Sequence, residues 1–398
     1  MQSQANQLPL MFSDRTNWKL TRNRLTEALE EVKSSGARVL DLTLSNPTRA
    51  GLLYDESVIL QSLASPDALD YDPDPKGLPS ARAAVAEYYA ADHKIAELDE
   101  RLILTTSTSE GYSFVLRLLC NPGDELLVPK PSYPLFEFLA DLQDVKLIPY
   151  PLIYDHGWQM DFPSLEKAVT KRTRGVVVVH PNNPTGSFVN PREQQQLNDF
   201  CSEHELAIIA DEVFLDYDHN RAPQQSFAAN QDILTFTLSG ISKIAALPQM
   251  KVAWIVTSGS QSKVDAAQAR LEVIADTFLS MNAPIQWALP ALLQQRQGIQ
   301  QQLLDRVLAN LAELDRQLPT QKDCERLRVE AGWYVVLRVP VTQTDEELAI
   351  DLLRRESVLV HPGHFYDFPA DGYLVLSLIT DKVEFAEAIA RVLKMLNL

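Results

Sequence analysis

Short runs of aliphatic and β-branched residues recur along this chain between longer stretches of helical pattern. Each run is too short for a helix, and an unbroken apolar run is typical of a strand that is buried on both faces. Strands that alternate with helices indicate βα units around a largely parallel sheet. The sequence therefore predicts an α/β fold with buried strands at residues 102–104, 125–128, 175–179, 206–210 and 252–256.

A loop with candidate functional residues follows each of these runs. In open α/β sheets, ligands bind beyond the carboxyl ends of the strands. We therefore expect the functional residues at that edge of the sheet. Residues 285–318 form a long amphipathic, Gln-rich stretch, which we expect to be helical and to link a large domain to a smaller one. Its run Gln300-Gln301-Gln302 is typical of a solvated helix face.

Composition excludes several classes of protein. A chain of 398 residues, 45% of them hydrophobic, can bury a large core in two domains. The net charge is −17 and no basic cluster stands out, so we expect no nucleic-acid partner and no anionic membrane surface as a partner. Residues 1–7 are polar and show no secretory signal, and no apolar run reaches membrane-spanning length.

The three cysteines, Cys120, Cys201 and Cys324, are widely spaced and odd in number. Their spacing resembles no metal site, so we expect reduced thiols, a cytoplasmic protein and no bound metal.

Lys243 is preceded by two small hydroxyl residues, Ser239 and Ser242, just after an apolar, strand-like run. A desolvated lysine amine can form a Schiff base with an aldehyde. Two suitable partners stand upstream, Asn183 in Asn-Pro-Thr-Gly and Asp211 in Asp-Glu at the end of an apolar run. Taken singly, each has a plainer interpretation: a surface lysine, a turn asparagine and a helix N-cap.

The order Asn-Pro-Thr-Gly, Asp-Glu, Ser-Lys resembles the fold-type I pyridoxal-phosphate (PLP) enzymes, specifically the class I and II aminotransferases, and the resemblance covers nearly the whole chain. It implies PLP as cofactor and a three-layer large domain with a mostly parallel sheet, plus a smaller α+β domain. We expect the large domain at residues 46–290 and a discontinuous small domain at residues 1–45 and 291–398. The resemblance also implies a homodimer with shared active sites.

Roles for individual residues follow from the resemblance. Lys243 would bind the cofactor covalently and later transfer protons, and Asp211 would keep the pyridine nitrogen protonated, so that the ring withdraws electrons. Asn183 would donate a hydrogen bond to the ring oxygen. Both Asn183 and Asn46, the latter in Ser-Asn-Pro, would border the substrate. Tyr133 would stack on the pyridine face, although a tyrosine between prolines is also common in loop packing.

The phosphate would be held by hydroxyls and backbone N–H groups at a helix N-terminus, for which Ser107, Thr108 and Ser109 are the candidates. A plain N-cap cluster is the alternative. Ser239 and Ser242 could add hydroxyls, and Lys251 stands where the family usually has an arginine. Tyr71 would reach the phosphate of the neighbouring subunit.

Two departures from the family pattern limit what the resemblance implies. Phe214 replaces the tyrosine that donates to the cofactor's ring oxygen. Val375 replaces the arginine that binds the substrate carboxylate, and no arginine occurs between Arg355 and Arg391. Substitutes could come from the amino-terminal segment, whose arginines also suit a solvated helix face; they are Arg15, Arg22 and Arg24. We expect His361 and His364 to be loop histidines, because Lys243 already fills the proton-transfer role.

The resemblance predicts an aminotransferase that moves an amino group between an amino acid and a 2-oxo acid by a ping-pong mechanism. A PLP-dependent lyase, such as a C–S lyase, would share every cofactor residue. A non-enzymatic PLP-binding protein is a third hypothesis, disfavoured by the absence of a basic segment.

Overall fold

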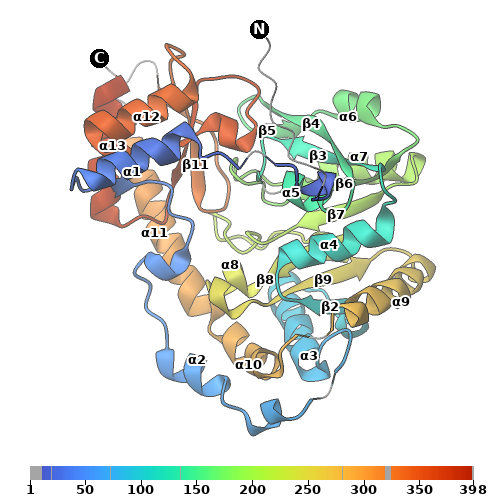
Figure 1. The fold of residues 1–398 in the computed structure, drawn as a ribbon. Coiled ribbons are helices and arrows are strands. Elements are labelled where there is room, and N and C mark those ends of the chain that lie inside the picture. Colours follow the sequence, from blue (N-terminus) through green and yellow to red (C-terminus); the bar gives the residue numbers. More distant parts are fainter. Residues whose placement is uncertain are drawn as a thin grey trace.

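The computed structural model of this chain describes residues 11–18, 20–71, 73–134, 136–279, 281–318 and 324–396. Residues 1–7, for which we expect no secretory signal, and Asp72 lie outside the described residues. Figure 1 shows a large sheet flanked by helices beside a smaller group of strands and helices, which includes both the first and the last long helices.

The described helices alternate with strands through most of the chain. They are α1 (Arg24–Ser34), α2 (Glu56–Ser62), α3 (Pro79–Tyr88), α4 (Thr108–Leu119), α5 (Phe136–Asp141), α6 (Phe162–Ala168), α7 (Pro191–Glu203), α8 (Ile241–Ile244), α9 (Gln261–Thr277), α10 (Ala283–Gln294), α11 (Arg296–Gln317), α12 (Asp345–Glu356) and α13 (Lys382–Leu396). A one-turn π-helix, η4 (Tyr89–His93), continues α3.

The described strands form sheets of eight, four and two strands, in the orders β2-β9-β8-β7-β6-β3-β4-β5, β10-β11-β14-β13 and β1-β12. Their bounds are β1 (Leu40–Asp41), β2 (Leu102–Thr105), β3 (Glu125–Lys130), β4 (Lys146–Tyr154), β5 (Trp158–Met160), β6 (Thr173–Val179), β7 (Ala207–Asp211), β8 (Thr235–Gly240), β9 (Ala253–Ser258), β10 (Glu325–Arg326), β11 (Tyr334–Arg338), β12 (Val358–Leu359), β13 (His361–Pro362) and β14 (Tyr373–Ser377).

The direction of the strands decides which loops meet. The strands β3, β6, β7 and β8 are parallel, and they end at one edge of the large sheet, here called the carboxyl edge. β9 runs antiparallel to both β8 and β2, so β2 ends at the carboxyl edge and β9 begins there. The expectation that a site loop follows residues 252–256 is therefore wrong. The residues at the edge, including Lys251, precede β9.

Helices cover both faces of the large sheet because its strands are apolar on both sides. In β6, Val176 and Val178 pack in a cluster with residues of α7. Val177 and Val179 pack on the opposite face with residues of α4 and α9. Successive residues of a strand point to opposite faces, which explains the unbroken valine run. The predicted α/β fold with a mostly parallel sheet is confirmed.

The smaller group has an antiparallel sheet. It packs with α1, α11, α12 and α13 around one core, to which residues 25–50 and residues 299–393 both contribute. The two ends of the described chain thus fold together, although the boundaries given above for the two domains stay predictions.

Residues 285–318 are helical but belong to two helices, α10 and α11, that meet at Gln295. The prediction of a solvated face holds for Gln301, which is exposed. It is wrong for Gln300, which is half-buried and hydrogen-bonds Asp216 and Ile244. Helical periodicity could not reveal this, because the partners come from distant loops.

Candidate active site

The predicted residues Asn183, Asp211 and Lys243 follow or end neighbouring strands at the carboxyl edge. Asp211 is the last residue of β7, and it lies level with Val179 of β6 and Leu238 of β8 in the sheet register. Lys243 comes soon after β8, on the short helix α8. The parallel sheet therefore brings three segments that are distant in sequence to one place.

Lys243 has a half-buried side chain. Its Nζ lies 5.4 Å from the centroid of the Phe214 ring and 4.8 Å from that of Trp333. Within the described residues, no hydrogen bond or salt bridge engages this amine. Burial lowers the pKa of Lys243 from 10.5 to about 8, and the charge of Asp211 opposes that shift. Near neutral pH a fraction of the amine is therefore unprotonated and nucleophilic.

Asp211 presents a buried carboxyl group at the carboxyl edge. It accepts hydrogen bonds from the Tyr112 hydroxyl at 3.2 Å and from the Val213 backbone N–H at 3.2 Å. Burial raises its pKa from 3.8 to about 6, whereas both hydrogen bonds and the charge of Lys243 act in the opposite direction. Among the described residues, no cation lies within salt-bridge distance of Asp211, so the carboxylate is available to a cationic group of a ligand.

Tyr133 lies in the loop after β3 and is 40% exposed. Its ring centroid lies 6.2 Å from that of Phe136, which lies 5.3 Å from that of Tyr112. Burial raises the pKa of Tyr133, and the charge of Asp211 adds to the shift. An aromatic series therefore connects the Tyr133 loop to the Asp211 carboxyl.

The loop that carries Asn183 is tied to the loop that carries Tyr133. The side-chain amide of Asn182 donates to the Pro131 carbonyl at 3.1 Å. Asn183 has a buried Oδ1 without a hydrogen-bond partner in the described part of the chain. An unpaired buried amide oxygen is costly, so this group is suited to a polar ligand.

Gly186 closes the Asn-Pro-Thr-Gly motif for a steric reason. Its φ is +66°, and a Cβ atom there would lie 2.4 Å from the Ala331 carbonyl oxygen. Only glycine suits both conditions. The motif thus also joins the large domain to the segment before β11.

The candidates for phosphate binding occupy the start of α4. Ser107 is the N-cap, and its Oγ accepts a hydrogen bond from the Glu110 N–H at 3.2 Å. Glu110 Oε2 in turn accepts from the Thr106 N–H at 2.6 Å. Thr108 and Ser109 form the first turn, where backbone N–H groups have no helical partners. Ser107 thus acts as a helix N-cap, which was the alternative to phosphate binding. The backbone N–H groups of the first turn stay available as hydrogen-bond donors.

The other phosphate candidates lie on either side of Lys243. Ser239 is buried, and its hydroxyl donates to the Glu212 carbonyl at 3.4 Å. Ser242 is half-buried on α8, whereas Lys251 is exposed just before β9. Gly240, the last residue of β8, pairs with Ala253, the first residue of β9. Lys243 shortly follows Gly240 and Lys251 shortly precedes Ala253, so both lysines lie at the same edge of the sheet.

Among the described residues, two predicted ones make no hydrogen bond, ion pair or ring contact with these groups. Tyr71 is 78% exposed. Asn46 is exposed, and its Oδ1 accepts hydrogen bonds from the N–H and the hydroxyl of Thr48, so it stabilises its own turn.

Val375 is fully buried in β14, level with Val336 of β11 and His361 of β13. Paired residues of neighbouring strands point to the same face, and the Ser377 hydroxyl on that face donates to the Leu44 carbonyl at 2.6 Å. The face around Val375 is therefore directed toward the segment that includes Asn46. His361 lies in a short strand rather than a loop, a correction that strand pairing explains.

The three candidate substitute arginines are engaged elsewhere. Arg15 pairs with Asp144, Arg22 with Glu30 and Arg24 with Glu346, at 2.5 to 3.0 Å. Their side chains are 50%, 65% and 60% exposed. This arrangement matches the alternative of solvated charges.

Two further residues contact the site without having been predicted. Tyr112 lies one helical turn after Thr108 on α4, and that spacing would have placed it on the same face. Trp333 directly precedes β11. Its approach to Lys243 depends on how the two sheets pack, which no local pattern reports.

These residues fit the cofactor that the resemblance implies. Asp211 is a buried carboxyl group with no cation within salt-bridge distance, and the Asn183 side-chain amide makes no hydrogen bond in the described part of the chain, so its Nδ2 is available as a donor. In the described structure the Lys243 amine has no hydrogen-bond or salt-bridge partner, and the start of α4 offers free N–H donors. Among the described residues, no group of His, Cys, Asp and Glu is arranged to hold a metal ion. In the same part of the chain, no helix is long and apolar enough to cross a membrane.

Comparison with known proteins agrees with this geometry. A glutamate-pyruvate aminotransferase of Haemophilus influenzae is 27% identical over 382 residues, which is 93% of each chain. An alanine aminotransferase of Mycobacterium tuberculosis is 28% identical over 371 residues, 90% of this chain and 86% of the relative.

The fold is shared with solved structures. An aminotransferase from Escherichia coli superposes with a TM-score of 0.86 at 25% identity, over 98% of this chain and 99% of that one. The model of the family described as aminotransferase class I and II matches residues 60–392. The chain therefore belongs to the class I and II aminotransferases, and it is a PLP-dependent enzyme that transfers an amino group between an amino acid and a 2-oxo acid.

Proposed function

We propose that Lys243 binds PLP covalently and moves the substrate proton, while Asp211 faces the pyridine nitrogen. The observation that carries this proposal is the pair of opposed pKa shifts at the carboxyl edge. The pKa of the Lys243 amine is lowered to about 8 and that of the Asp211 carboxyl is raised to about 6. Neither side chain has a salt-bridge partner within the described residues, and perturbed groups of this kind gather at functional sites.

When bound, PLP supplies an aldehyde carbon that condenses with amines and a protonated ring that withdraws electrons. The protein's own residues do the rest. The Lys243 Nζ, near the Phe214 and Trp333 rings, is unprotonated often enough to accept a proton from the substrate carbon and return it. Asp211, whose carboxylate accepts a hydrogen bond from Tyr112, would keep the ring nitrogen protonated.

The remaining residues bind and orient. Asn183 would hydrogen-bond the ring oxygen and border the substrate, and Tyr133 would cover one face of the ring. The phosphate would be bound by the start of α4, by hydroxyls beside Lys243 and by the charge before β9; the residues are Ser107, Thr108, Ser109, Ser239, Ser242 and Lys251. Asn46, which stabilises its own turn, would act only by shaping the substrate side.

We infer that neutral donors replace the missing arginine. Tyr334 shares the strand face of Val375 and lies 6.4 Å, between ring centroids, from Phe214 beside Lys243. The Tyr366 hydroxyl lies 3.1 Å from Nδ1 of His361. The backbone carbonyl of Tyr366 accepts a hydrogen bond from the N–H of Ser132, which is next to Tyr133. Tyr334 and His361 of the small sheet, and Tyr366 in the 3-10 helix Gly363–Tyr366 that follows β13, would thus approach the site from the same side. They would bind the substrate's carboxylate or a neutral polar group in its place.

The names of the relatives suggest the substrates to test first. We propose alanine and glutamate as amino donors, with pyruvate and 2-oxoglutarate as acceptors. The experiment is a screen of these and of aspartate and aromatic donors, followed by analysis of the cofactor after donor addition alone. Accumulation of pyridoxamine phosphate supports the proposed ping-pong transfer. Release of ammonia with the cofactor unchanged would contradict it.

The site assignment has its own test. Borohydride reduction should fix PLP to the peptide that contains Lys243, and a label on any other lysine would contradict the assignment. In apoenzyme, the rate of PLP attachment should rise as the pH passes about 8, because the unprotonated amine attacks.

We also propose that the enzyme is a homodimer. The segment around α2 exposes large apolar side chains, with Leu53 81%, Leu60 64%, Leu69 90% and Tyr71 78% exposed. Clustered exposed apolar groups of this kind mark interaction surfaces. A second copy of the chain would cover them and would place Tyr71 near the phosphate of its partner. Sedimentation of the holoenzyme tests the dimer.

A cytoplasmic location is part of the proposal. Cys120, Cys201 and Cys324 are all free thiols, as expected in a reducing compartment.

A further inference from the structure

The turn that carries Lys243 is held by side chains from distant parts of the chain. The helix α8 has only four residues. Its Lys243 carbonyl accepts from the Ala246 N–H at 3.1 Å, whereas its Ile244 carbonyl has no backbone partner in the described chain. Residues 241–246, here called the lysine turn, also accept three hydrogen bonds from distant side chains at backbone carbonyls: Tyr217 donates to Lys243 at 2.6 Å, Gln300 to Ile244 at 3.0 Å and Tyr54 to Ala246 at 2.9 Å.

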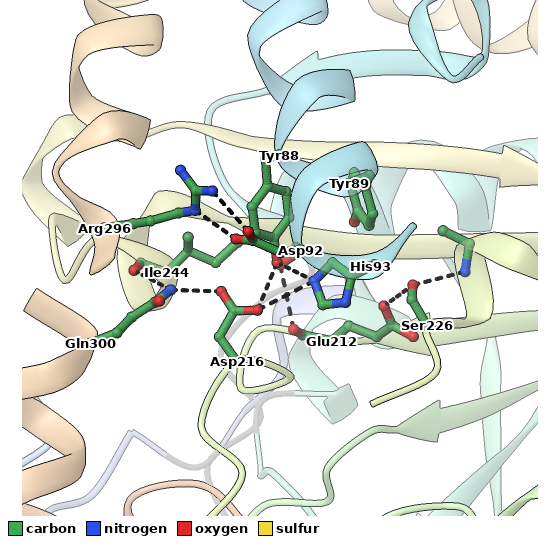
Figure 2. Close-up of polar contacts among 12 residues, drawn as sticks. Tyr88, Tyr89, Asp92, His93, Glu212, Asp216, Ser226, Ile244, Arg296 and Gln300 are labelled. Atoms are coloured by element: carbon green, nitrogen blue, oxygen red, sulfur yellow. Dashed lines mark hydrogen bonds and ion pairs between the residues drawn. The ribbon is translucent and has the colours of Figure 1, made fainter. Parts of the chain in front are cut away.

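Gln300 is itself oriented by Asp216. Its Nε2 donates to Asp216 Oδ2 at 2.7 Å and to the Ile244 carbonyl at 3.0 Å, so both amide hydrogens are used. Figure 2 shows the Gln300 amide between these two acceptors. Without Asp216, the amide would be free to rotate away from Ile244.

Asp216 has a fixed place because its other oxygen is also bonded. Oδ1 accepts from the Tyr88 hydroxyl at 2.9 Å and lies 3.3 Å from His93 Nε2. The Asp216 side chain is only 8% exposed. The carboxylate therefore links η4 and the end of α3 to α11.

A second ion pair, between Arg296 of α11 and Asp92 of η4, lies beside the Asp216 carboxylate and its partners Tyr88 and His93. Arg296 binds Asp92 through Nε at 2.7 Å and through Nη2 at 3.0 Å. Its guanidinium lies 5.4 Å from the centroid of the Tyr88 ring (Figure 2). By contrast, both oxygens of the nearby Glu212 are occupied by Ser226 and Phe227. Of the carboxylates of Asp92, Glu212 and Asp216, it is that of Asp216 that hydrogen-bonds Gln300, the side chain that supports the lysine turn.

We propose that Asp216 is a positioning residue for the transfer reaction. Acting through Gln300, it fixes the Ile244 carbonyl and thereby the direction in which the Lys243 side chain leaves its turn. This inference rests on the proposed role of Lys243. A displacement of about 1 Å in a reacting group can slow a reaction by roughly 10²-fold.

The first test is Gln300→Leu, which removes both hydrogen bonds. Gln301→Leu is the matched control, because Gln301 is exposed and bonds Asp305 and Arg221, away from the lysine turn. We expect kcat of the Gln300 variant to fall by about tenfold to 10²-fold, with KM changed by less than about threefold. The absorbance titration of its bound cofactor should shift, while PLP content and the Gln301 control stay as in the wild type.

A double variant separates positioning from simple stabilisation. In D216N/Q300E the donor and the acceptor of the pair exchange places, so the pair can form again with the same net charge. No donor then faces the Ile244 carbonyl. We expect the melting temperature to recover relative to Asp216→Asn alone, while kcat stays low. Recovery of kcat together with the melting temperature would overturn the proposal.

Failure of this inference differs from failure of the proposed function. If borohydride does not label Lys243 in the wild type, the function assigned to that residue fails. If Lys243 is labelled, and Gln300→Leu matches Gln301→Leu in kcat and in the cofactor titration, only the role of Asp216 fails.

Discussion

The carboxyl edge of the large sheet and the strand face around Val375 contribute to one site, but they are built differently. At the edge, Asp211 and Lys243 are positioned by neighbouring parallel strands, so the sheet itself sets their separation. Around Val375, the polar groups come from an antiparallel sheet, and their approach depends on the packing of two domains. In the function proposed above, cofactor chemistry is therefore tied to backbone topology, whereas substrate selection would rest on side chains that can vary without disturbing it.

The largest effect is expected at the edge. Lys243→Ala should lower kcat by at least about 10³-fold, because it removes both the covalent link and the proton acceptor. Its melting temperature as apoenzyme should not fall, since Nζ makes no hydrogen bond in the described structure. Steady-state kinetics and mass spectrometry after borohydride reduction measure the two effects. Lys263→Ala on α9 is the control, and equal losses in both variants would exclude a special role for Lys243.

The second prediction separates charge from shape at the edge. Asp211→Asn preserves the size of the side chain but removes the charge that keeps the ring nitrogen protonated. We expect kcat to fall by about 10² to 10³-fold. The pKa of Lys243 should fall further, because the charge of Asp211 supports its protonated form. Competitive acylation of the apoenzyme measures that pKa, and turnover within threefold of the wild type would refute the role of Asp211.

The third prediction concerns the face around Val375. Tyr334→Phe should raise KM for the amino donor by roughly tenfold, the effect of losing one hydrogen bond to a charged group. PLP affinity should stay unchanged if the two regions are independent. The combined alanine replacement of Arg15, Arg22 and Arg24 should change kcat/KM by less than about threefold. A large loss in the arginine variant with none in Tyr334→Phe would reverse this assignment.

The smallest effect is expected from Phe214→Tyr, which restores the family's residue beside Lys243. A hydroxyl that donates to the cofactor's ring oxygen would stabilise its anionic form and lower the proton affinity of the neighbouring imine. The absorbance titration of the bound cofactor should therefore move to lower pH. An unchanged midpoint would show that another group already satisfies the ring oxygen.

The sequence predicts those features that depend on local pattern. The valine run of β6 reports burial on both faces, and the ends of β7 and β8 place Asp211 and Lys243 together. The direction of β9 could not be predicted, because an apolar run looks the same in either direction. Gln300 was placed in solvent since its partners Asp216 and Ile244 lie far away along the chain. The contact of Trp333 with Lys243 is likewise absent from any local pattern, since it joins segments beside two different sheets.

The short distance between Trp333 and Lys243 has an optical consequence. The indole ring lies 4.8 Å from Nζ, so a chromophore attached there would be close enough to take up the excitation energy of this tryptophan. The intrinsic fluorescence of the protein should therefore dim as the cofactor binds and brighten as it leaves. The occupancy of the site could then be followed by light emission alone, before any substrate is known.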